Sequence, residues 1–105
     1  MAVLQVSQDK FKEEVLDYKG LVFVDFYAEW CGPCKVTSPL IEEISEERKD
    51  IKFVNVDVDQ NSNVSSQYSV YSIPTFIIFK DGKVVNQFVG AMGKESFLEE
   101  IKKSE

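Results

Sequence analysis

The chemistry open to this chain begins with two thiols. Cys31 and Cys34 are its only cysteines, and they belong to the segment Cys31-Gly32-Pro33-Cys34, which follows Trp30 and the mostly apolar residues 21–26. We expect the segment to join a buried strand to the first turn of a helix, where unpaired N–H groups stabilise an anion. Because the thiolate is the form that attacks a disulfide, this placement predicts thiol–disulfide exchange.

The spacing predicts different roles for the two thiols. Cys31 comes first, at the expected helix N-terminus beside a solvent-facing Trp30, and we expect it to be exposed and to act as the nucleophile. Cys34 follows three residues later on the same helix face and slightly deeper, so it is predicted to resolve the mixed disulfide by attacking Cys31. Pro33 suits a first helical turn because it lacks an N–H group that would be unpaired there.

Two other uses of the cysteine pair are weaker. A structural disulfide across so short a loop would stabilise the fold by only roughly 2 kcal/mol in the loop-entropy model. A zinc site needs four ligands, and the chain offers two thiols and no histidine, so we predict no metal site. The lack of histidine also excludes Ser-His-Asp and Cys-His hydrolases.

Asp25 is the second chemically unusual residue, because it lies in the otherwise apolar run before the cysteines. Burial of a carboxyl group favours its neutral form. Asp25 precedes Cys31 by six residues and Cys34 by nine, which is expected to place it beneath the dithiol, where it could take the proton of Cys34 directly or through a water. The alternative is that the strand ends early and Asp25 faces solvent or caps a turn.

Length, composition and charge limit the remaining possibilities. The chain has 105 residues, of which 44% are hydrophobic, and we expect one domain covering residues 1–105. Its net charge of −6 argues against nucleic-acid and anionic-membrane partners. No apolar stretch is long enough to span a membrane, and the first residues do not resemble a secretion signal, so the expected location is the cytoplasm.

The pattern along the chain predicts an α/β sandwich of about five strands and about four helices. A helix with Ser7 as its N-cap and a long helix running to about Lys49, bent by Pro39, precede a hairpin whose turn is Asp81-Gly82. Parallel crossovers therefore come first and an antiparallel hairpin closes a mixed sheet. The expected strands cover residues 3–6, 21–27, 51–58, 75–79 and 83–89, and the other helices cover 61–68 and the region around 97–101.

Several motifs at matching spacings resemble the thioredoxin family over essentially the whole length of the chain. They are residues 24–35 (VDFYAEWCGPCK), Pro39, Ile73-Pro74-Thr75, Lys80-Asp81-Gly82 and Gly90-Ala91. Two positions depart from the family pattern: Tyr27 stands where a second Trp is common, and Asn55 stands where many members carry a charged residue, often Lys, that faces the buried Asp.

The resemblance implies a three-layer thioredoxin-like fold and a monomer that holds no prosthetic group. It implies reduction of disulfides in target proteins and recycling by a separate thioredoxin reductase, linked to either NADPH or ferredoxin. By the same resemblance, Pro74 is expected to be cis and to face the cysteines, although X-Pro bonds are cis in only about 5–6% of folded cases. The residues implied to bind targets are Trp30, Gly32, Pro33, Ile73, Pro74, Thr75, Gly90 and Ala91.

Simpler roles stay open for some of these residues, and other functions stay open for the chain. Trp30 and Ile73 could be core residues, and the glycines could serve only as turn residues. A thiol oxidase or isomerase is disfavoured because Gly-Pro replaces an interior with a histidine. An interaction subunit that uses the docking surface without turnover is the alternative from a different class.

Overall fold

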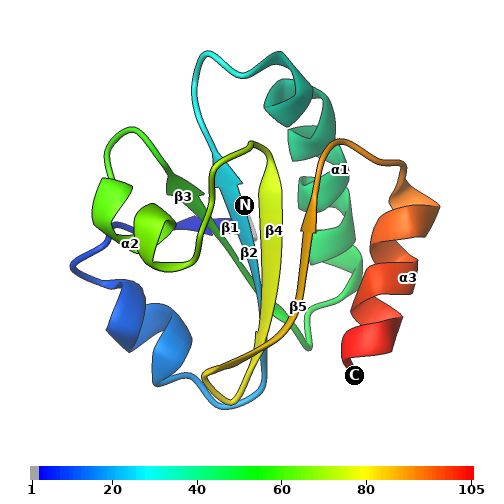
Figure 1. Cartoon of the computed structure of the whole chain (residues 1–105). Helices are drawn as coiled ribbons and strands as arrows, with labels where there is room; N and C mark the ends of the chain where they lie inside the picture. The colour runs from blue at the N-terminus through cyan, green and yellow to red at the C-terminus, as the bar shows by residue number, and fades with distance from the viewer. Residues whose placement is uncertain (1–2) are drawn as a thin grey trace.

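A computed structural model describes residues 3–105, in which five strands form one mixed sheet (Figure 1). The strand order is β1-β3-β2-β4-β5, with β1, β3 and β2 parallel and with β4 and β5 added as antiparallel neighbours. This order confirms the predicted change from parallel crossovers to a hairpin. The strands are β1 (Val3–Gln5), β2 (Leu21–Tyr27), β3 (Lys52–Asp57), β4 (Thr75–Lys80) and β5 (Lys83–Val89).

Helices cover both faces of the sheet and complete the three predicted layers. The helices α1 (Gly32–Glu47) and α3 (Lys94–Ser104) lie on one face, and the helical turn η1 (Lys12–Leu16) and α2 (Ser62–Gln67) lie on the other (Figure 1). The central strand β2 is therefore covered on both sides, which explains why its sequence is continuously apolar instead of alternating.

Each face of the sheet has its own hydrophobic core. Under α1 and α3, Phe23 of β2 packs against Phe53 and Phe76 with ring centroids 5.2 and 5.7 Å apart. Burying one such side chain contributes about 1.5–3 kcal/mol, so this cluster, which also contains residues of α1 and α3, holds both helices against this face of the sheet. On the opposite face, Phe11 and Val15 pack with Val24 and Phe26.

The first helical segment differs from its prediction. Helical winding begins at Lys12, after Phe11, whereas Ser7 bonds through its hydroxyl group to Asp9 in an exposed turn. The prediction of Ser7 as an N-cap is therefore wrong, because the burial of Phe11 and Val15 sets where the turn forms. The segment is wound as a π-helix, in which the N–H of Asp17 donates to the carbonyl of Lys12 at 2.8 Å.

Pro39 lies inside α1, and the helix continues past it to Glu47, two residues short of the predicted end. The β4–β5 turn was predicted correctly: Asp81 and Gly82 both have positive φ, of 51° and 83°, as the tight hairpin turn requires. The carboxylate of Asp81 accepts a hydrogen bond from the N–H of Gly20 at 2.8 Å, which ties this turn to the start of β2.

We expect Gly82→Ala to lower the free energy of unfolding by about 1–3 kcal/mol. A Cβ atom at this position would lie 2.4 Å from the carbonyl oxygen of Leu16, and the backbone is left-handed. The matched control is Gly93→Ala, where the added Cβ meets no atom within 4 Å and φ is −81°. Denaturant melts of both variants would measure the difference, and equal stability of the two would contradict this account of the turn.

Candidate active site

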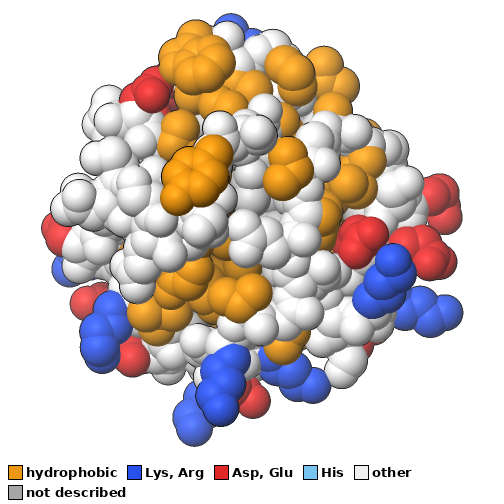
Figure 2. Space-filling model, viewed as in Figure 1, with side chains coloured by type: hydrophobic (Ala, Val, Ile, Leu, Met, Phe, Trp, Pro, Cys, Tyr) orange, Lys and Arg blue, Asp and Glu red, His pale blue; other side chains and the backbone are white. Residues whose placement is uncertain are grey.

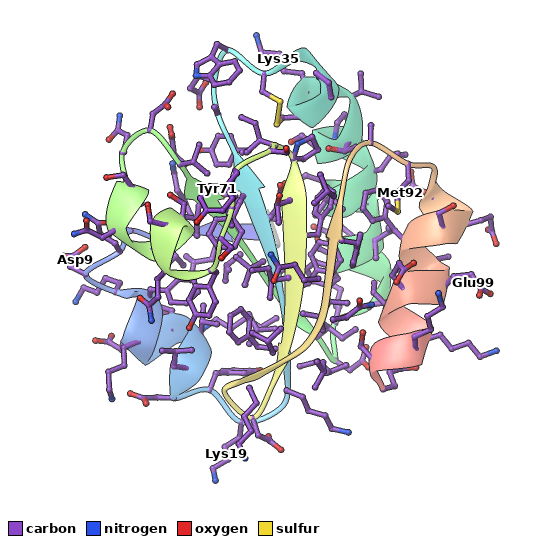
Figure 3. All side chains as sticks on the ribbon, in the orientation of Figure 1. Asp9, Lys19, Lys35, Tyr71, Met92 and Glu99 are labelled. Atoms are coloured by element: carbon purple, nitrogen blue, oxygen red, sulfur yellow. A yellow bond between two sulfur atoms is a disulfide. The ribbon has the colours of Figure 1, made fainter. Side chains whose placement is uncertain are left out.

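The two cysteines lie at the start of α1, where they form a disulfide with Cα atoms 5.3 Å apart (Figure 3). Cys31 is the N-cap residue, with extended backbone at φ −86° and ψ 110°, and Pro33 occupies the first helical turn. The backbone N–H of Cys34 donates to the Sγ atom of Cys31 at 3.2 Å. The Cys31 sulfur therefore takes the place of a capping oxygen, which is where a helix N-terminus stabilises negative charge.

Both cysteines are buried in the disulfide, which corrects the expectation that Cys31 would be exposed. The exposed fractions are 3% for Cys31 and 5% for Cys34. With Ala28 they form a small cluster, and Val58 and Ile73, from distant parts of the chain, pack against it. The difference between the two thiols therefore comes from capping geometry, because only the Cys31 sulfur accepts a hydrogen bond within residues 3–105.

The peptide bond between Ile73 and Pro74 is cis. The resemblance to the thioredoxin family implied this, whereas the residues alone favoured a trans bond. The carbonyl of Pro74 accepts a hydrogen bond from the N–H of Gly90 at 2.9 Å, and the hydroxyl of Thr75 donates to the carbonyl of Ser72. Pro74 and Thr75 are buried, and the half-buried Ile73 reaches the cysteine cluster. The Ile-Pro-Thr segment is thus brought next to the disulfide from the start of β4.

Trp30 faces solvent, because 70% of it is exposed, which excludes a core role. Its indole N–H donates to a carboxylate oxygen of Asp59 at 2.7 Å. The sequence reasoning missed Asp59. The strand order could have indicated it. Trp30 follows β2 and Asp59 follows β3, and loops that follow two neighbouring parallel strands leave the sheet at the same edge.

Hydrophobic side chains gather at the end of the molecule where β2 passes into α1, whereas most Lys and Arg side chains in this view lie at the opposite end (Figure 2). Gly32, Pro33 and Ala91 are exposed, and Gly90 is half-buried with a left-handed φ of 101°. The sequence reasoning did not select several large exposed hydrophobic residues, among them the three most exposed apart from Trp30, which are Tyr71, Val36 and Val89.

Asp25 lies within β2 and is only 6% exposed, so the alternative of an early strand end is excluded. Burial raises the pKa of its carboxyl group from 3.8 to about 7. Its Oδ1 atom has no hydrogen-bond partner within the described chain. A pocket of about 250 Å³ borders both Asp25 and Cys34, and its other lining residues are Tyr27, Ala28, Glu29, Lys35, Ser38 and Asn55.

Within residues 3–105, no three His, Cys, Asp or Glu side chains lie close enough together to hold a metal ion. None of the helices in this part of the chain has the length and apolar character needed to cross a membrane.

A cysteine that caps a helix and is disulfide-bonded to a second cysteine one turn later is typical of the α/β proteins that exchange a dithiol for a disulfide. A sequence model of the thioredoxin family matches residues 2–103. Thioredoxin 1 of Nostoc sp. and the thioredoxin of Synechocystis sp. are each 45% identical over 103 residues, which cover 97% of this chain and 96% of the relative. The thioredoxin of Mycobacterium tuberculosis is 45% identical over 101 residues, covering 95% of this chain and 87% of the relative.

The chain therefore belongs to the thioredoxin family, and it is a dithiol–disulfide oxidoreductase.

Proposed function

We propose that this protein reduces disulfides in target proteins in the cytoplasm as a single monomeric domain, and that a thioredoxin reductase returns it to the dithiol form. The observation that carries the proposal is the 3.2 Å hydrogen bond from the Cys34 N–H to the Cys31 sulfur at the start of α1. In the dithiol form the same donor stabilises the Cys31 thiolate, which is the attacking species.

The reaction has two exchange steps. In the first, the Cys31 thiolate attacks a target disulfide, so that a Cys31–target bond forms and one target thiolate leaves. In the second, Cys34 gives its proton to the Asp25 carboxylate and attacks the Cys31 sulfur, which forms the Cys31–Cys34 bond and releases the second target thiolate. The target gains two electrons, the protein loses two, and the proton on Asp25 passes to the leaving thiolate or to solvent.

The role of Asp25 is supported by its position and its pKa. The pocket that borders Asp25 also borders Cys34, so a proton has a short route between them. A pKa of about 7 lets the carboxyl group both accept and release a proton near neutral pH.

The surface around the disulfide is proposed to dock an extended segment of the target. Trp30, Gly32 and Pro33 are sequence neighbours of the two cysteines, and Ile73, next to Pro74 and Thr75, packs against the cysteine cluster; these residues form the two sides of the proposed docking surface. Gly90 and Ala91 extend the second side, because the N–H of Gly90 is bonded to Pro74. Exposed aromatic and apolar groups in such a rim are the usual anchors of protein interfaces.

Reduction of insulin disulfides by the pre-reduced protein tests the proposal. The wild type should consume its dithiol as insulin thiols appear, and a variant with both cysteines changed to serine should have no activity. Retention of function by that variant would instead indicate an interaction subunit. An equilibrium potential measured against glutathione separates a reductase, with a strongly negative value, from an oxidase.

We expect Pro33→His to make the dithiol–disulfide pair more oxidising. A protonated ring beside the Cys31 thiolate stabilises the reduced form, and a stabilisation of about 1.4 kcal/mol corresponds to roughly 30 mV. Pro33→Gln is the matched control, because it makes the same backbone change without adding a titrating ring. A potential in the His variant that equals the control value or is more negative would contradict the electrostatic account of the helix N-terminus.

A further inference from the structure

The side chains of Asp25 and Asn55 share an unusual property. Within residues 3–105, their Oδ1 atoms are the two buried side-chain oxygen or nitrogen atoms that lack a hydrogen-bond partner. Buried polar atoms are otherwise almost always paired, because leaving one unpaired costs about 1–3 kcal/mol. Two such atoms at one place need a common explanation.

These two residues are direct neighbours in the sheet. Asp25 of β2 and Asn55 of β3 are register partners in the parallel pair, so their side chains leave the same face, which is the face that α1 covers. On its other side, in β4, Asp25 is opposite Phe76, which offers no hydrogen-bonding side chain. Asn55 is therefore the one polar neighbour that the adjacent strands offer to the Asp25 carboxyl group.

An amide suits a carboxyl group that gains and loses a proton. The amide carries an acceptor oxygen and a donor NH₂ on the same carbon, and a half-turn about the Cβ–Cγ bond exchanges them. Its oxygen can accept from the protonated acid, and its NH₂ can donate to the carboxylate. A lysine would stabilise only the anion, and a leucine would serve neither form.

We propose that Asn55 is a positioning residue for the proton transfer between Cys34 and Asp25, and that its side-chain amide turns over as Asp25 changes protonation state. This inference rests on the proposed function, because it refines the second exchange step. Both unpaired oxygens belong to residues that line the same pocket as Cys34. In the proposal, the amide oxygen accepts from the protonated form of Asp25, and the turned amide donates to the carboxylate that receives the proton of Cys34.

Few charged groups compete with the amide at this site. Tyr27 and Glu29 border the pocket from β2 and the loop that follows it. Cys34 and Lys35 border it from α1. From β3, Asp57 lies opposite Tyr27, and its carboxylate is bonded to the N–H of Asp59 at 2.9 Å. The phenol of Tyr27 is bonded to the side chain of Gln5 at 2.9 Å. Of the pocket residues, Lys35 is the one cation, and it is exposed to solvent.

Two variants of Asn55 should move the titration of Asp25 in opposite directions. Asn55→Leu removes both hydrogen bonds, and because the bond to the carboxylate is the stronger one, the pKa of Asp25 should rise. At pH 7 the resolution of mixed disulfides should then slow by about tenfold, with the loss disappearing at higher pH. Asn55→Lys adds a cation, so the pKa of Asp25 should fall and the midpoint of the pH profile should fall with it.

The experiment is a ¹³C NMR titration of labelled aspartate in the full-length oxidised protein, paired with stopped-flow measurement of mixed-disulfide resolution across pH. Ser38→Ala is the matched control, since Ser38 borders the same pocket from α1 and should leave both midpoints unchanged. A purely structural role for Asn55 would alter stability in the leucine variant without moving the Asp25 titration, and that result would overturn the proposal.

If the leucine variant fails to fold, Asn55→Ala tests the same loss of the amide with a smaller side chain. An unchanged Asp25 titration in that variant would overturn the proposal as well. Failure of the proposed function would give a different result. In that case the resolution rate of the wild type would not follow the titration of Asp25 at all, which would overturn the proton transfer and this inference together.

Discussion

A Cys34→Ser variant should capture target proteins as stable mixed disulfides, whereas Cys31→Ser should capture none. Cys31 is the N-cap of α1 and its sulfur accepts the N–H of residue 34, so its thiolate is the attacking group. Without the second thiol, the Cys31–target bond has no internal attacker and persists. Insulin reduction should fall by about 10³-fold or more in either variant, because the two thiols act as one unit and losing one is equivalent to losing both.

Non-reducing electrophoresis of each variant after incubation with oxidised insulin would show the captured species. The variant with both cysteines replaced controls for non-covalent association, and added dithiothreitol should release every captured chain. Equal capture by the two single variants would mean that either sulfur can attack, and the assignment of roles from helix capping would be wrong.

Asp25→Ala should give a more stable protein that is a poorer reductase. The Asp25 carboxyl group is 6% exposed and its Oδ1 atom is unpaired, so its removal should raise the free energy of unfolding by about 1–4 kcal/mol. Asp57→Ala is a matched control of opposite sign. Asp57 is equally buried at 6% exposure, but its carboxylate accepts the N–H of Asp59, so its loss should destabilise the fold by about 1 kcal/mol.

The gain from Asp25→Ala should depend on pH in a defined direction. The folded state raises the pKa of Asp25 from 3.8 to about 7, so between these values the folded protein keeps a proton that the unfolded chain releases. The wild type therefore loses stability as pH rises from about 4 to about 7, by a total on the order of 4 kcal/mol. The difference between variant and wild type should grow over the same interval and stay constant above it.

Denaturant melts of the oxidised proteins at several pH values would measure this difference. Insulin reduction across the same series should show slower turnover of the variant at neutral pH and a smaller deficit at high pH, where Cys34 ionises without help. A variant that is less stable and equally active would show that Asp25 is an ordinary structural acceptor.

The features that local sequence predicted well are those that neighbouring residues determine. The hairpin strand at residues 83–89 has the predicted bounds, because Asp81 and Gly82 meet the left-handed backbone that the turn requires. The buried setting of Asp25 followed from the apolar residues on both sides of it. The helix-capping position of Cys31 followed from Pro33 and the preceding strand.

The features that local sequence predicted poorly depend on contacts between distant segments. Ser7 has the side chain of an N-cap, but the burial of Phe11 against the sheet set the start of the helical turn. A cis bond before Pro74 cannot be derived from that residue pair, and the resemblance supplied it. The burial of Cys31 depends on Val58, just after β3, and on Ile73, shortly before β4, which the fold brings to the disulfide.

The burial of both cysteines also determines which reductants can act on this protein. An in-line attack on a disulfide needs open space beyond the sulfur under attack, and here the two residues are only 3% and 5% exposed. A protein partner can replace the contacts that cover the bond with its own, whereas a small free thiol offers little contact surface. We therefore expect glutathione to reduce the oxidised protein more slowly than a protein partner does, so an equilibrium with glutathione should need long incubation, and over short times the redox state should follow the protein partners it meets.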